Sequence, residues 1–204
     1  LFNFPPGDWG AGERGFAALP DRRSDFLAAL DLGLDYGKAL GVPQMHLLAG
    51  LASRHDPAAV AAYRDGLLLA ADRTADAGIG LLIEPLNPRD MPGYFLDDFG
   101  FAADLIADLG HPNIRLQYDL YHRHVLHGES LETLASLLPI IGHVQVAAAP
   151  HRHEPGSGDH DDFATLRLLD ARGYTGYVGC EYRPAAGTVA GLGWLAEFRS
   201  ESGR

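Results

Sequence analysis

Residues 81–85, Leu81-Leu82-Ile83-Glu84-Pro85, form a short apolar run that ends on a carboxylate. Three further runs end on an acidic or amide side chain in the same way: Leu116-Gln117-Tyr118-Asp119, Gly142-His143-Val144-Gln145-Val146 and Val178-Gly179-Cys180-Glu181-Tyr182. Side chains of a strand alternate between its two faces, so Gln117 shares a face with Asp119. A barrel interior is normally filled by bulky branched residues. Polar side chains at the ends of four strands therefore indicate a functional site.

The rest of the chain alternates short apolar runs with longer amphipathic ones, which is typical of repeated βα units. We expect strands ending at residue 4 and over 45–49, 79–84, 114–119, 140–146 and 177–181. We expect helices over 22–40, 56–77, 97–109, 131–138 and 163–172, and an irregular or helical tail over 187–204. No Gly-rich dinucleotide fingerprint follows any strand, which disfavours a doubly wound sheet. The pattern therefore predicts an α/β fold of the (β/α)8 TIM-barrel type, with its chemistry at the carboxyl ends of the strands.

The chain has 204 residues, whereas a full TIM barrel typically has about 250. It opens without a Met on Leu1-Phe2-Asn3-Phe4, which looks like the end of a strand. No linker or change of composition divides it. We therefore expect a single domain over 1–204, an incomplete, N-terminally truncated barrel with about strands 3 to 8 and without its first two βα units.

Three of the strand-end residues are carboxylates, and they would repel one another strongly in a low dielectric. A divalent cation would resolve this repulsion. The predicted ligands are all hard oxygens if Gln145 offers its amide oxygen: Glu84, Asp119, Gln145 and Glu181. Oxygen ligands favour Mg²⁺ or Mn²⁺ over Zn²⁺.

Three other residues are candidates for substrate binding. His122 lies three residues beyond Asp119, where we expect a loop, and it could donate to a substrate oxygen or simply pack there. Arg152 could clamp a carboxylate with its planar fork, or it could be a solvated loop residue. Trp9 could wall the substrate pocket or only anchor its loop. His151, His153 and His160 suggest a separate zinc site, which the lack of an accompanying Cys disfavours.

The composition limits the partners. A formal net charge of −11 argues against nucleic acid and against an anionic membrane surface. No apolar run approaches the length needed to span a bilayer. We therefore expect a cytoplasmic protein without a nucleic-acid or membrane partner, which could form a homo-oligomer.

Several motifs resemble the hydroxypyruvate isomerase family of the xylose isomerase-like barrel superfamily: residues 83–90 (Ile-Glu-Pro-Leu-Asn-Pro-Arg-Asp), 117–122 (Gln-Tyr-Asp-Leu-Tyr-His), 142–145, 152–156 and 179–182. The resemblance implies a metal bound by the four residues named above, with Glu84 and Glu181 as the acid/base pair. The chain departs from the family pattern after residue 146. The family usually has Ala-Asp-Asn-Pro-Gly-Arg there, and this chain has Ala147-Ala148-Ala149-Pro150-His151-Arg152.

The activity that this resemblance implies is a metal-dependent isomerisation of a small hydroxy-carbonyl acid, in which hydroxypyruvate becomes tartronate semialdehyde by an intramolecular proton transfer through an ene-diolate. One alternative is a 2-oxotetronate isomerase or a related sugar epimerase on the same barrel. Two alternatives come from other classes: a non-catalytic sugar-acid binding module, and a DNA-repair nuclease of the same superfamily. The nuclease would need a His-rich cluster of several metals and a basic face, so Gln145 and the net charge disfavour it.

Overall fold

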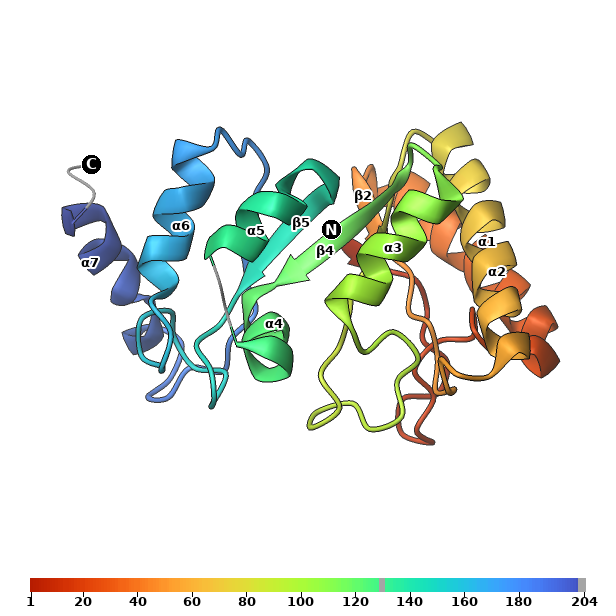
Figure 1. Cartoon of the computed structure of the whole chain (residues 1–204), viewed down its shortest axis with the longest axis horizontal. Helices are drawn as coiled ribbons and strands as arrows, with labels where there is room; N and C mark the ends of the chain where they lie inside the picture. The colour runs from red at the N-terminus through yellow and green to blue at the C-terminus, as the bar shows by residue number, and fades with distance from the viewer. Residues whose placement is uncertain (129–130, 202–204) are drawn as a thin grey trace. The chain divides into compact units, whose positions relative to one another are not determined.

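The computed structural model describes residues 1–128 and 131–201. Contacts between Cα atoms divide the chain into two compact units, Leu1–Gln117 and Tyr118–Arg204. Figure 1 shows the helices and strands of both units, with β4 (Ile114–Asp119) as one uninterrupted strand that contains the boundary. The two units are described separately below.

The first unit alternates strands with helices in the predicted way. Its elements are β1 (Phe2–Asn3), η1 (Pro20–Arg22), α1 (Arg23–Leu40), β2 (Gln44–His46), α2 (Pro57–Asp76), β3 (Gly80–Ile83), α3 (Phe99–Leu109) and most of β4. Helix α1 buries Phe26, Leu30 and Leu34, which are spaced four residues apart and so lie on one face. It ends at Gly41, whose φ of 63° is the left-handed conformation that glycine adopts without strain.

The strands of the first unit pair in parallel and in chain order. Met45 of β2 lies opposite Leu81 of β3, and Leu81 lies opposite Ile114 of β4. These three side chains are at most 1% exposed, so the register places a row of apolar residues inside the unit. This burial provides the main driving force for pairing the strands.

The second unit contains the end of β4 and the remaining elements. They are α4 (Leu120–His127), α5 (Leu131–Leu137), η2 (Leu138–Ile140), β5 (Ile141–Val146), α6 (Asp162–Ala171), β6 (Val178–Cys180), η3 (Ala190–Leu192) and α7 (Trp194–Glu201). Strands β5 and β6 are parallel, with Val144 opposite Val178 and Gln145 opposite Gly179. Neighbouring strands of the sheet follow chain order from β1 to β6, as a barrel requires.

Two sequence expectations need comment. A loop was expected at His122, but this residue lies in α4, a helix that begins directly after β4. The tail expected over 187–204 is helical at 190–192 and 194–201, and residues 202–204 lie outside the described residues. Within the described part of the chain, no helix combines the length and the apolar character that crossing a bilayer would require.

Candidate active site

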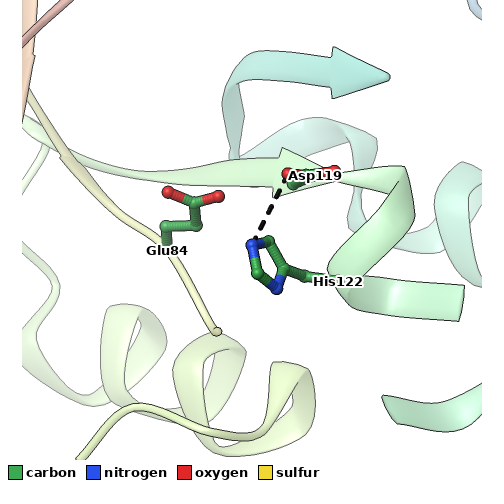
Figure 2. A group of neighbouring side chains, drawn as sticks. All are labelled: Glu84, Asp119 and His122. Carbon is green, nitrogen blue, oxygen red and sulfur yellow. Dashed lines mark ion pairs between the residues drawn. The ribbon is translucent and has the colours of Figure 1, made fainter. Parts of the chain in front are cut away.

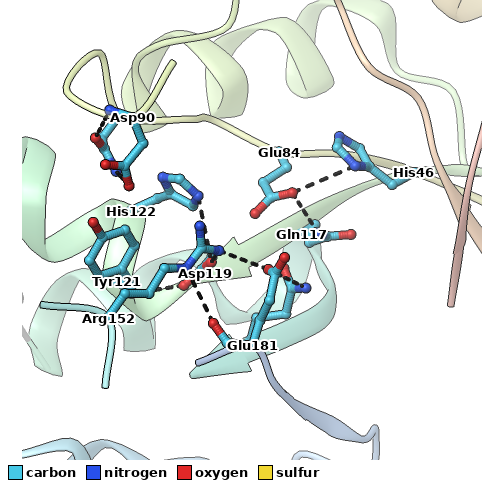
Figure 3. A network of polar contacts seen from close by, with 11 residues as sticks. His46, Glu84, Asp90, Gln117, Asp119, Tyr121, His122, Arg152 and Glu181 are labelled. Atoms are coloured by element: carbon cyan, nitrogen blue, oxygen red, sulfur yellow. Dashed lines mark hydrogen bonds and ion pairs between the residues drawn. The ribbon is translucent and has the colours of Figure 1, made fainter. Parts of the chain in front are cut away.

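The first unit holds a buried carboxylate at the end of β3. Glu84 follows Ile83 directly and is 5% exposed. Gln117 of β4 donates a hydrogen bond from its Nε2 to Oε2 of Glu84, at 2.6 Å, and Nδ1 of His46 lies 3.6 Å from the same oxygen. Figure 3 shows both side chains directed at this carboxyl group. Three neighbouring strands therefore place polar groups around one acid.

The second unit holds Asp119 at the end of β4, with its side chain fully buried. Its Oδ1 accepts a hydrogen bond from the backbone N–H of Tyr121 at 2.8 Å, so Asp119 also caps the N-terminus of α4. Burial raises the pKa of Asp119 to about 7, since a desolvated carboxylate loses hydration, and the nearby positive charge of Arg152 opposes this rise. A positive charge near Asp119 therefore stabilises its ionised form.

Arg152 joins Asp119 to Glu181 within the second unit. Its Nη2 lies 3.2 Å from Oδ2 of Asp119 and 2.9 Å from Oε2 of Glu181. Its Nε donates to the backbone carbonyl of Glu181 at 3.2 Å, and its guanidinium lies 4.8 Å from the centre of the Tyr121 ring. Figure 3 shows the guanidinium between the two carboxyl groups. Arg152 is therefore an anchored residue rather than a solvated one.

The backbone of Arg152 has an unusual conformation. Its φ of 58° is positive, which non-glycine residues seldom adopt because the Cβ crowds the backbone. Such strain persists where the surrounding contacts hold it, often at functional sites. The ion pairs with Asp119 and Glu181 are contacts of this kind.

Gln145 and Glu181 meet as the alternation of their strands predicts. Nε2 of Gln145 donates to Oε2 of Glu181 at 2.9 Å. A Cβ built on Gly179 would lie 3.0 Å from His143 Nε2 and 3.3 Å from Gln145 Cγ, so the three positions share a face. The side chain of Glu181 is 54% exposed, in contrast to the buried carboxyl group of Asp119. The second unit therefore brings together two of the expected acids, the expected amide and the expected arginine.

Two other candidates lie in different surroundings. His122 is buried on the first turn of α4, where the sequence predicted a loop, because capping by Asp119 starts a helix at once. Trp9 lies in the loop after β1, is 48% exposed, and stacks against the guanidinium of Arg14 at 3.7 Å. The contact with Arg14 supports the loop-anchoring alternative, and a role of Trp9 in substrate binding stays a prediction.

Each unit offers donor atoms of the kind that a divalent cation binds. Glu84, Asp119 and His122 are buried, and each offers an oxygen or nitrogen atom that can bind a metal ion. Figure 2 draws these three side chains and marks the ion pair in the second unit, where Nε2 of His122 lies 3.7 Å from Oδ2 of Asp119. A buried carboxylate is stabilised by a nearby cation, which offsets its lost hydration. His122, expected only as a substrate donor, is thus also a potential nitrogen ligand.

Sequence reasoning missed His46. This residue ends β2, is 3% exposed, and faces Glu84. Burial lowers the pKa of its imidazole to about 3, so His46 is neutral at neutral pH. The strand was predicted over 45–49, which places His46 near its start, whereas the observed strand ends at His46, so its position at a strand end became visible only in the structure.

Comparison with known proteins places the chain in a family. The family model of the xylose isomerase-like TIM barrel matches residues 1–198. The chain belongs to this family, and the barrel fold predicted from the sequence is confirmed.

Named relatives are similar over nearly the whole chain. The 2-oxo-tetronate isomerase of Cupriavidus necator is 42% identical over 97% of this chain and 77% of its own length. The hydroxypyruvate isomerase of Escherichia coli K12 is 38% identical over 98% of this chain and 78% of its own length. Among solved structures, the "AP endonuclease, family 2" of Brucella melitensis has a TM-score of 0.92 at 38% identity, covering 97% of this chain and 77% of that one.

Proposed function

We propose that this chain binds one divalent cation and interconverts hydroxypyruvate and tartronate semialdehyde. The hydroxypyruvate and 2-oxo-tetronate isomerases among its relatives identify it as an isomerase enzyme. The observation that carries the proposal lies within the second unit, where Arg152 pairs with both Asp119 and Glu181 and Gln145 donates a hydrogen bond to Glu181. The two carboxylates can bind a metal and transfer a proton, and Arg152 can bind an acidic substrate.

The proposed ligands are Glu84, Asp119, Gln145 and Glu181. Strand β4 connects the first of them to the others, because it passes unbroken from one unit to the next. Gln117, which bonds Glu84, stands two residues before Asp119 on this strand, and residues two apart project to the same face. The proposed set therefore takes Glu84 from the first unit and Asp119, Gln145 and Glu181 from the second, within a single domain.

The reaction moves one proton between neighbouring carbons. One carboxylate removes a proton from C3 of hydroxypyruvate, and a proton returns at C2 after passage through an ene-diolate, while the hydroxyl proton moves from the oxygen on C3 to the oxygen on C2. We assign these transfers to Glu84 and Glu181, since a carboxylate can use one oxygen for binding and the other for the proton. A bound divalent cation would supply Lewis-acid stabilisation of the developing negative charge, an effect of several kcal/mol. Arg152 and His122 would hold the substrate carboxylate and a substrate oxygen.

The 2-oxotetronate alternative has a specific observation in its favour, because the relative with that name is 42% identical. Both substrates carry a carboxylate beside a carbonyl, so Arg152 suits either. Comparing kcat/KM for hydroxypyruvate with that for four-carbon 2-oxo acids decides between them. Absence of turnover on the whole panel would favour the non-catalytic sugar-acid binding module.

A nuclease is disfavoured by the net charge of −11, which repels a phosphate backbone. A cytoplasmic location and a homo-oligomeric state remain predictions.

Metal dependence gives the first prediction. After removal of divalent cations with a chelator, Mg²⁺ or Mn²⁺ is expected to restore turnover better than Zn²⁺, because most of the proposed ligands are hard oxygens. The measurement is the initial rate after titration of each metal into the stripped enzyme. Since His122 offers a nitrogen, reactivation by Mn²⁺ well above that by Mg²⁺ would indicate that it also binds the metal. Turnover supported by Zn²⁺ alone would contradict the oxygen-ligand assignment.

Arg152 gives the second prediction. The substitution Arg152→Ala is expected to raise KM for hydroxypyruvate while kcat changes little, if the residue binds the substrate carboxylate equally in the ground and transition states. It should also strengthen Mn²⁺ binding in the absence of substrate, because the guanidinium is a positive charge within hydrogen-bond distance of Asp119 and Glu181 and so competes with the metal for both carboxylates.

Steady-state kinetics and calorimetric titration with Mn²⁺ test both parts of this prediction. Arg199→Ala in α7, an exposed arginine of the same unit, is the matched control and should change neither quantity. An unchanged KM in Arg152→Ala would remove Arg152 from substrate binding.

A further inference from the structure

His46 has no assigned role in the proposed reaction, yet it lies against one of the proposed catalytic acids. It belongs to β2 of the first unit, and its side chain is 4% exposed. Its Nδ1 lies 3.6 Å from Oε2 of Glu84, the oxygen that also accepts the hydrogen bond from Gln117. Both neighbours therefore act on the same oxygen of the carboxylate (Figure 3).

The position of the imidazole proton follows from the surroundings. A neutral histidine carries one N–H and one acceptor nitrogen. In the described part of the chain, Nε2 of His46 is buried and meets no hydrogen-bond partner. A proton on Nε2 would be a buried donor without an acceptor, whereas a proton on Nδ1 faces the carboxylate of Glu84. The Nδ1–H tautomer is therefore favoured.

The distance of 3.6 Å is longer than a hydrogen bond, and the contact is electrostatic in this structure. Such contacts in a catalytic site are often long in the ligand-free protein and shorten once ligands bind. The hydrogen bond from Gln117 already holds Oε2 of Glu84 at 2.6 Å, so only a short movement is needed for His46 to bond the same oxygen. A small rotation of the Glu84 side chain or of the imidazole would bring the two groups within hydrogen-bond distance.

We propose that His46 is a positioning residue, which with Gln117 holds Oε2 of Glu84 and so fixes the carboxylate for metal binding and proton transfer. This inference rests on the proposed function, because it assigns a partner to one of its ligands. His46 acts through Glu84 and does not contact the substrate. Partners that orient a metal ligand typically contribute about 10–100-fold to metal affinity or activity.

Three substitutions separate this role from simple packing. His46→Asn can place an amide N–H near the position of Nδ1, whereas His46→Gln places it near Nε2, and His46→Leu removes it. With metal-stripped protein and calorimetric titration of Mn²⁺, His46→Leu and His46→Gln should bind about 10–100-fold more weakly than the wild-type protein. His46→Asn should stay within several-fold of the wild type. His111→Leu, a histidine paired with Asp72 in the same unit, is the control and should bind normally.

Kinetics with hydroxypyruvate at saturating Mn²⁺ give a second measurement. His46→Leu and His46→Gln should have a lower kcat than the wild type with little change in KM, whereas the kcat of His46→Asn should stay close to that of the wild type. The wild-type rate tests the proposed function separately. If wild-type protein binds Mn²⁺ but does not isomerise any member of the substrate panel, the function fails while the Mn²⁺ titrations still test His46.

Thermal unfolding in chelator shows whether each variant folds. If His46→Leu does not fold, the comparison of Asn with Gln decides, because both retain an amide of similar polarity. Equal Mn²⁺ affinity and equal kcat in the wild type and in all folded variants would overturn the proposal. Equal losses of Mn²⁺ affinity and kcat in His46→Asn and His46→Gln would overturn it too, since an N–H at the Nδ1 position would then have no special effect.

Discussion

Replacing Glu181 with Gln is expected to lower kcat for hydroxypyruvate by about 10²–10⁴, the usual contribution of one general acid/base group. Gln keeps a carbonyl oxygen that can bind a metal, but it cannot take up or release the proton. Metal affinity should therefore fall much less than kcat. Glu84→Gln should have the same effect, although its carboxyl group is buried and that of Glu181 is half exposed.

Exchange of the substrate C–H proton with D₂O, followed by NMR, measures the proton transfer separately from product release. Glu197→Gln is the matched control, because Glu197 is an exposed residue of α7 in the same unit as Glu181, and it should exchange at the wild-type rate. If Glu181→Gln also exchanges at the wild-type rate, Glu181 is at most a ligand, and the mechanism with two carboxylates is wrong.

The strands and most helices could be predicted from the sequence because their signals are local. The strand over 114–119 was predicted with its observed bounds, because a turn containing Gly and Pro precedes it and the polar residue Asp119 ends it. The meeting of Gln145 with Glu181 was also predictable in outline, because parallel strands in register place residues of the same face side by side.

Helix α4 was not predicted, and the reason is a residue with two roles. Asp119 was interpreted as a strand-end ligand, so the residues after it were expected to be loop. Its Oδ1 in fact accepts the N–H of Tyr121 and starts a helix immediately. Aspartate is a favoured capping residue, but one sequence does not show which of two roles its side chain takes.

Long-range contacts were the least predictable part of the site. For Arg152 the sequence left two alternatives open, a carboxylate clamp and a solvated residue, because its glycine-containing loop shows no period that would place the side chain. The ion pairs with Asp119 and Glu181 arise from residues 33 and 29 positions away. His46 was missed for a related reason, since its partner Glu84 belongs to the next strand and only the fold brings them together.

Asp119→Asn is expected to weaken Mn²⁺ binding by more than about 100-fold, which is the upper range for residues that only orient a ligand. The substitution removes the negative charge and preserves the shape and the capping oxygen. Without metal, burial holds the pKa of Asp119 at about 7, so part of the wild-type population is already neutral at neutral pH. The metal-free variant should therefore fold with a melting temperature close to that of the metal-free wild type, whereas turnover should be lost.

A second substitution separates the ligand role of Asp119 from its capping role. Asp119→Ala removes both, so it should lose Mn²⁺ binding as Asn does and also lose about 1 kcal/mol of unfolding free energy. Asp161→Ala is the matched control, because Asp161 caps α6 in the same unit by accepting from Ala164 N–H at 2.8 Å. It should lose similar stability and keep full Mn²⁺ affinity. Calorimetric titration and urea unfolding measure the two effects. Wild-type Mn²⁺ affinity in Asp119→Asn would mean that Asp119 only caps α4 and anchors Arg152, and the proposed metal centre would be wrong.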